Sequence, residues 1–159
     1  MHNEGFQIRR ATPEDIYEIK KITAQAFKEY DRLAGGINGL DALTETDEDI
    51  MHDIETKVVF VAFMDDSIVG SVRVKVNDDN TAYLSRFAVS PEFQNLGIGK
   101  ALMNLVDIHM RHIGVKHMEL HTASKITTLI RFYYGRGFYI DSTSKDRGYI
   151  RALLCKDYE

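Results

Sequence analysis

The sequence predicts a single α/β domain in which a mixed, mostly antiparallel sheet carries helices on both faces. Short segments in which apolar residues alternate with polar ones, or run together, are typical of strands. They are interleaved with longer segments whose apolar residues recur every three to four positions, as in amphipathic helices. The chain of 159 residues is 44% hydrophobic, which suits one domain with its own core.

The first expected elements are a strand at residues 6–9 and a helix that ends near Tyr30. Thr12 and Asp15 fit the two ends of a capping box, and Pro13 suits the first helical position. The apolar residues of this helix form one stripe, which predicts that it packs against a sheet.

A loop and a second helix are expected next. The loop at residues 31–44 contains three glycines, and a capping box from Thr46 to Asp49 opens the short helix after it. Successive strands joined by short polar turns follow, and such strands pair antiparallel. These strands are expected at residues 58–63, 68–76 and 82–89.

Two helices and three strands complete the chain. The helices are expected at residues 101–113 and 125–134, and the strands at 115–122, 138–140 and 149–154. The resulting order, β-α-α-β-β-β-α-β-α-β-β, is typical of a mixed sheet covered by helices on both faces.

The composition excludes several classes of protein. With Cys155 as the only cysteine, no disulfide can form within the chain, which favours a reducing, cytoplasmic setting. The formal net charge of −4 argues against a broad surface for nucleic acid or anionic membrane. No apolar run approaches the roughly 20 residues of a membrane span. The first ten residues hold no apolar signal core, so export is not expected.

The most informative segment lies between the strand at 82–89 and the helix that follows, and reads Gln94-x-x-Gly97-x-Gly99. Glycines let a backbone approach an anion closely, and the free N–H groups of a helix N-terminus attract it. The pattern therefore predicts a pyrophosphate-binding turn, with two structural glycines at a helix start as the alternative.

Two other phosphate motifs do not fit this segment. A P-loop needs a glycine where Gln94 stands and a serine or threonine where Ala101 stands. A dinucleotide-binding fingerprint needs a third glycine where Leu102 stands, and it directly follows the first strand.

Two segments resemble motifs of the GNAT superfamily of acyl-CoA N-acyltransferases. Residues 82–102 are similar to the strand–turn–helix motif of that family, and residues 120–138 to its later strand–helix segment. The first segment shares Val89, Pro91, Gln94, Gly97 and Gly99. The second shares Phe132, Tyr133, Gly137 and Phe138.

The resemblance implies acetyl-CoA as cosubstrate and indicates which residues bind it. Backbone amides of the glycine turn would bind the pyrophosphate. The end of the preceding strand would pair its backbone with the pantetheine arm, with one N–H facing the thioester carbonyl. The implied residues are Phe87, Ala88, Val89, Gln94, Asn95, Leu96, Gly97, Ile98, Gly99 and Lys100.

The resemblance also implies a general acid, Tyr133, which would protonate the departing thiolate. A phenol is protonated at neutral pH and can therefore donate. The alternative for Tyr133 is a packing role beside Phe132, and Tyr134 does not fit the spacing of the motif. Many family members have an asparagine near the start of this helix, where the sequence has Ile126, Thr127 and Thr128.

The general base has no direct match. Tyr83 stands about where a strand glutamate of the family would lie. Glu119 and His121 share one face of a later strand, and either can act on the amine through water. For Glu119, the alternative is an edge carboxylate without a catalytic role.

Other charged residues have ordinary interpretations. The histidines do not complete a ligand set by their spacing, so no metal is expected. The acidic segment 41–55 fits a solvated helix start, or else a surface that attracts a cationic amine. Four basic residues are candidates for the charged end of coenzyme A, without an assigned role. They are Arg131, Arg136, Lys145 and Arg147.

These features predict one N-acetyltransferase domain over residues 1–159. It would transfer an acetyl or other short acyl group from acetyl-CoA to a primary amine of a small molecule or peptide, by direct attack. The competing hypothesis is a non-catalytic acyl-CoA-binding module that senses acyl-CoA or regulates a partner. Neither nucleic acid nor a membrane is expected as partner, and homodimers are common in the family that the sequence resembles.

Overall fold

The computed structural model describes residues 5–37 and 39–159. Residues 1–4 of the N-terminal segment and Asn38 of the glycine-bearing loop lie outside the described residues. The strands are β1 (Gln7–Arg10), β2 (Val58–Met64), β3 (Ser67–Val76), β4 (Thr81–Val89), β5 (His117–Ala123), β6 (Tyr139–Ser144) and β7 (Arg151–Asp157). The helices are α1 (Ile16–Leu33), α2 (Asp47–Thr56), α3 (Ile98–His112) and α4 (Thr127–Gly135).

All seven strands form one sheet in the order β1-β2-β3-β4-β5-β7-β6. Every neighbouring pair is antiparallel except β4 and β5, which run parallel. The predicted mixed, mostly antiparallel sheet is therefore confirmed. Among the described helices, none combines the length and the apolar character needed to cross a membrane.

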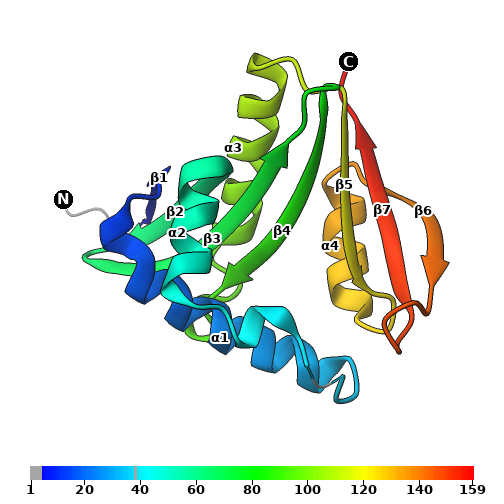
Figure 1. The fold of residues 1–159 in the computed structure, drawn as a ribbon, viewed down its shortest axis with the longest axis horizontal. Coiled ribbons are helices and arrows are strands. Elements are labelled where there is room, and N and C mark those ends of the chain that lie inside the picture. Colours follow the sequence, from blue (N-terminus) through cyan, green and yellow to red (C-terminus); the bar gives the residue numbers. More distant parts are fainter. Residues whose placement is uncertain (1–4, 38) are drawn as a thin grey trace.

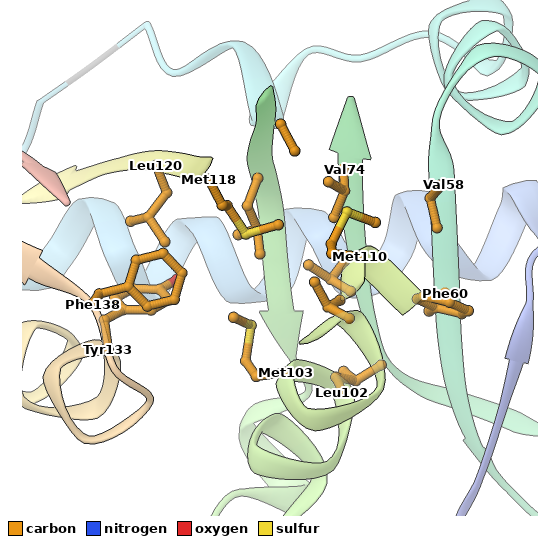
Figure 2. Packing of buried hydrophobic residues seen from close by; sticks show 14 of the residues in the cluster. Val58, Phe60, Val74, Leu102, Met103, Met110, Met118, Leu120, Tyr133 and Phe138 are labelled. Carbon is orange, nitrogen blue, oxygen red and sulfur yellow. The ribbon is translucent and has the colours of Figure 1, made fainter. Parts of the chain in front are cut away.

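Helices cover both faces of the sheet, as predicted, and each face has its own core. Helices α3 and α4 pack on one face through residues such as Leu102, Met103 and Tyr133 (Figure 2). Ile19 of α1 and Ile50 of α2 pack on the other face. Because side chains alternate along a strand, neighbouring residues of β2 contribute to opposite cores.

The sheet opens between β4 and β5 (Figure 1). Only residues 81–83 of β4 pair with β5, opposite residues 117–119. Further along β4 there is a bulge, where Arg86 and Phe87 together lie opposite one residue of β3. Arg86 has a left-handed φ of 52° there. A bulge bends its strand and increases its twist, so this one directs the end of β4 away from β5.

Helix α1 lies across the open end of the sheet (Figure 1). Its Tyr30 hydroxyl accepts a hydrogen bond of 2.7 Å from the backbone N–H of Ala123 at the end of β5. The helix continues beyond the expected end near Tyr30 to Leu33, and the left-handed Gly35 and Gly36 follow it.

The last strand is also longer than predicted, since it continues to Asp157. Lys156 interrupts the apolar pattern of the strand but is buried. Its ammonium group donates to Asp107 at 2.6 Å and to the carbonyl of Arg136 at 2.5 Å. A buried lysine with such partners is compatible with a sheet position that its type disfavours.

Candidate active site

Two adjacent cavities lie where β4 and β5 separate. The first, the strand-end cavity, measures about 350 Å³. It is lined by residues 87–89 at the end of β4, by Gln94, and by residues from α1 and the start of α4. These lining residues include four of the predicted cofactor-binding residues, Phe87, Ala88, Val89 and Gln94, together with Ile126 and Thr128.

The glycine turn adjoins this cavity and has the conformation that its sequence demands. Asn95 and Gly97 both adopt left-handed backbone angles, and Gly97 stands directly before the first turn of α3. The Gln94 side chain donates to the carbonyl of Val89 at 3.1 Å and so fixes the turn to β4. A Cβ atom on Gly99 would lie 2.9 Å from the ring of Phe87. Gly99 is therefore also needed for packing between α3 and β4.

The electrostatics of this helix start favour an anion. The first turn of α3 contains no acidic residue, whereas that of α2 contains three. The first N–H groups of a helix have no intrahelical partners and carry a partial positive charge. In α3 neither an acidic cap nor an acidic first turn neutralises that charge, and the turn carries Lys100.

The second cavity, the polar cavity, also measures about 350 Å³. It shares Phe27, Tyr30, Phe87 and Leu129 with the strand-end cavity, so the two meet around Phe87. Its polar lining includes Tyr83, His121, Tyr133, Tyr149, Arg147 and Arg151.

Tyr133 belongs to the core and also reaches the polar cavity. Its ring is part of the core (Figure 2), 5.4 Å from the ring of Phe132 and 5.7 Å from that of Phe138. It also lines the polar cavity. Burial raises its pKa well above the usual range, so the phenol stays protonated at neutral pH. Tyr134, by contrast, is 65% exposed.

Tyr83 and His121 form a hydrogen-bonded pair that spans β4 and β5. The Tyr83 oxygen lies 2.6 Å from Nδ1 of His121. Burial, followed by the nearby charge of Arg151, lowers the pKa of His121, whereas burial raises that of Tyr83. At neutral pH the phenol therefore donates and the imidazole accepts. Nδ1 of His121 is a proton acceptor reached through the Tyr83 hydroxyl.

Glu119 lies outside the lining of both cavities. Its carboxylate contacts Nε2 of His117 at 3.0 Å, and Nδ1 of the same ring lies 2.7 Å from Asp157. The donor atoms of His117, Glu119 and Cys155 gather within 4.8 Å, a grouping from two strands that sequence spacing does not reveal. Burial raises the pKa of the Cys155 thiol to about 11, so this group is a protonated thiol beside an imidazole already engaged by two carboxylates.

Two carboxylates of the acidic segment 41–55 are bound inside the protein. Fully buried Arg73 of β3 binds Glu45 through two hydrogen bonds of 2.6 and 2.8 Å, and Asp53 at 2.9 Å. Arg86 also contacts Glu45, and Lys57 contacts Asp53. Glu45 and Asp53 are therefore bound internally. The acidic first turn of α2, Asp47 to Asp49, is exposed, as expected for a solvated helix start.

Several cavity residues could not be identified from the sequence. Tyr30 and Tyr149 come from segments without a motif, and Arg151 begins a strand. Arg147 was considered for the charged end of the cofactor, but it lines the polar cavity instead. The only available signal was the concentration of Arg and Tyr in residues 147–151.

Comparison with known proteins identifies the family. The family model described as acetyltransferase (GNAT) family matches residues 17–138. The chain therefore belongs to the GNAT acetyltransferase family, as the two sequence motifs indicated.

The two curated relatives compared next share less than a third of their aligned residues with this chain. The chain is 25% identical over 152 residues to mycothiol acetyltransferase of Propionibacterium freudenreichii. This match covers 94% of this chain and 47% of that protein. It is 29% identical over 82 residues to spermidine N(1)-acetyltransferase of Thermoplasma acidophilum. This match covers 52% of this chain and 50% of that protein. The chain thus matches about half the length of these curated relatives.

Among solved structures, the PaiA N-acetyltransferase of Thermoplasma acidophilum, in complex with coenzyme A, has the same fold. Its TM-score is 0.84 at 22% identity, over 97% of this chain and 99% of that chain. The likeness extends over essentially the whole fold.

Proposed function

We propose that this protein transfers an acetyl or other short acyl group from acetyl-CoA to a primary amine by direct attack on the thioester. The observation that carries this proposal is the junction of the two cavities at Phe87. One cavity adjoins the glycine turn, and the other contains a protonated phenol and a hydrogen-bonded Tyr–His pair. The buried thiol is compatible with a cytoplasmic location, which we also propose.

The glycine turn and the end of β4 would hold the cosubstrate. Backbone N–H groups from Asn95 to Lys100 would bind its pyrophosphate, as at other helix N-termini. The end of β4, from Phe87 to Val89, pairs with β3 but not with β5, so its other edge offers main-chain groups to the extended pantetheine arm. One of those N–H groups would stabilise the oxyanion that forms when the amine attacks.

Three side chains would move the protons. As the C–N bond forms, Tyr83 accepts a proton from the amine, directly or through one water, and passes its own proton to Nδ1 of His121. As the C–S bond breaks, the Tyr133 hydroxyl donates a proton to the thiolate. His121 thus takes the place proposed from the sequence for Glu119 or His121, since the Glu119 carboxylate contacts His117 instead.

Direct attack is supported by the position of the only thiol. Cys155 is 2% exposed and lines neither cavity, and its raised pKa keeps it protonated. A thiol in this state is a poor nucleophile.

The test is a coenzyme-release assay over a panel of primary amines, with calorimetric titration of acetyl-CoA on the same protein. Binding together with amine-dependent release of free thiol is the expected result. Binding without release for any amine would support the non-catalytic module instead, and absence of binding would refute both.

A matched pair of glycine variants tests the turn. Gly97 and Gly114 have nearly the same left-handed φ, 83° and 86°, and an added Cβ meets nothing within 4 Å at either. Each change to alanine is therefore expected to cost about 1 kcal/mol of stability. Only Gly97→Ala should also raise the Kd of acetyl-CoA, by about tenfold, as calorimetry would show. Equal Kd values for the two variants would exclude the turn from the binding site.

The pH dependence of kcat tests His121. Because burial and Arg151 lower the pKa of this imidazole, its neutral, proton-accepting form persists below pH 6.5. Activity should therefore be lost only as the pH falls through this lowered pKa, and His121→Gln should remove that acidic limb and lower kcat roughly tenfold. His109 is the control, since burial also lowers its pKa but it lines neither cavity. An unchanged limb in His121→Gln would contradict the role.

A further inference from the structure

The polar cavity carries more positive than negative side chains. Four cations line it, against the two carboxylates of Asp41 and Asp53. Two of the cations are bound to the acidic segment 41–55, since Lys57 contacts Asp53 at 3.2 Å and Arg86 contacts Glu45 at 3.2 Å. The other two are Arg147 and Arg151.

These two arginines keep donor groups that the protein does not use. Arg147 makes no hydrogen bond or ion pair with another described residue. Arg151 is only 9% exposed, and its Nε has no hydrogen-bond partner among the described residues. Its Nη2 contacts Asp146 at 3.2 and 3.3 Å, and that aspartate is 60% exposed.

A buried guanidinium donor without a partner is costly unless something else accepts from it. Asp146 does not reach Nε, and its exposure allows water to screen the pair. Arg151 therefore lies in the wall of the cavity with a buried donor from which no described residue accepts. A planar guanidinium matches the two oxygens of a carboxylate particularly well.

The effect on neighbouring groups agrees with a positive cavity. The charges of Arg151 and Arg147 each act to lower the pKa of Tyr83 and that of His121. Both arginines therefore lie near the pair that would receive the proton of the amine, so a ligand group held by them would be close to the reacting nitrogen.

Building on the function proposed above, we propose that the acceptor is an amino acid, whose carboxylate binds Arg147 and Arg151 while its amine faces Tyr83. This subsite is positively charged, whereas the acidic segment 41–55 suggested a negatively charged surface for a cationic amine. Two carboxylates of that segment, Glu45 and Asp53, are bound to Arg73 instead. A polyamine would meet the positive charges of Arg147 and Arg151 in this cavity and should be a poor acceptor.

The kinetic test compares amino acids of varied side chain, each with the amine that remains when its carboxylate is removed, and includes 1,4-diaminobutane. For the pair that contains the best acceptor, wild-type protein should show a kcat/KM at least about tenfold higher for the amino acid than for the corresponding amine. Arg147→Gln should abolish this preference, because it should lower kcat/KM for the amino acid and leave kcat/KM for the amine unchanged. Lys145→Gln is the control, since Lys145 is exposed in the same segment but lines neither cavity.

A binding measurement separates this proposal from the proposed function. The same amino acids are titrated calorimetrically into protein saturated with coenzyme A, for wild type, Arg147→Gln and Arg151→Lys. Binding that both variants weaken supports the carboxylate subsite even if no amine is turned over. If wild type binds no amino acid, or if amines and 1,4-diaminobutane are better acceptors, the subsite is refuted while acetyl-CoA turnover still decides the proposed function.

Discussion

Replacing Tyr133 with phenylalanine is expected to lower kcat by about 100-fold or more while leaving the Kd of acetyl-CoA unchanged. The variant removes only the hydroxyl, which makes no hydrogen bond to another described residue. The ring keeps its contacts with Phe87, Phe132 and Phe138, so the fold and the cavity wall should persist. What is lost is the proton for the departing thiolate, and a poorer leaving group slows breakdown of the tetrahedral intermediate.

The measurement is steady-state coenzyme release alongside calorimetric titration of acetyl-CoA. Tyr134→Phe is the matched control, because it removes the same hydroxyl from the next residue, which lies on the exposed face of α4. If both variants kept wild-type kcat, Tyr133 would be a packing residue, and the general acid would have to be sought elsewhere.

Replacing Arg73 with methionine is expected to lower the free energy of unfolding by about 3 to 5 kcal/mol. Arg73 is fully buried in β3 and holds Glu45 and Asp53 of the acidic segment 41–55. Removing it would leave these two carboxylates close together in a largely buried site, with Arg86 and Lys57 as their remaining partners. Most of the loss therefore comes from charges without sufficient compensation.

Denaturant unfolding of three proteins tests this prediction. Lys75→Met changes an exposed lysine two residues along the same strand and should cost little. Adding Glu45→Gln and Asp53→Asn to Arg73→Met neutralises the stranded carboxylates and should recover part of the loss. If Arg73→Met were as stable as wild type, the buried ion pairs would not hold this part of the fold together.

The local elements of the fold could be predicted because their signals are local. The capping box from Thr46 to Asp49 is present, with Thr46 Oγ1 accepting from the N–H of Asp49 and the Asp49 carboxylate from that of Thr46. Strand ends were less predictable, since β7 continues through Lys156, whose partner Asp107 lies 49 residues away. Only a tertiary contact makes that residue acceptable in a sheet.

The candidate site also contains residues that a local sequence signal indicates and residues that only the tertiary structure brings together. The glycine turn and Tyr133 belong to contiguous motifs, so the sequence indicated them. The pair of Tyr83 and His121 joins residues 38 apart, and no spacing rule connects them. The internal partner of Glu45 and Asp53 could not be predicted for a related reason. The acidic segment contains no arginine or lysine, and the counter-ion Arg73 comes from a strand that follows it.

The separation of β4 from β5 has a further consequence for solubility. Beyond Tyr83 in β4 and Glu119 in β5, the facing edges of the two strands do not pair with each other. Free strand edges are templates for pairing between molecules, and proteins usually cover them. Here the two edges face a shared interior space, and the Tyr30 hydroxyl already occupies one amide of β5. The arrangement leaves main-chain groups available to an extended small molecule. Helix α1 lies where another copy of the chain would have to enter, so it protects these two inner edges from pairing between molecules.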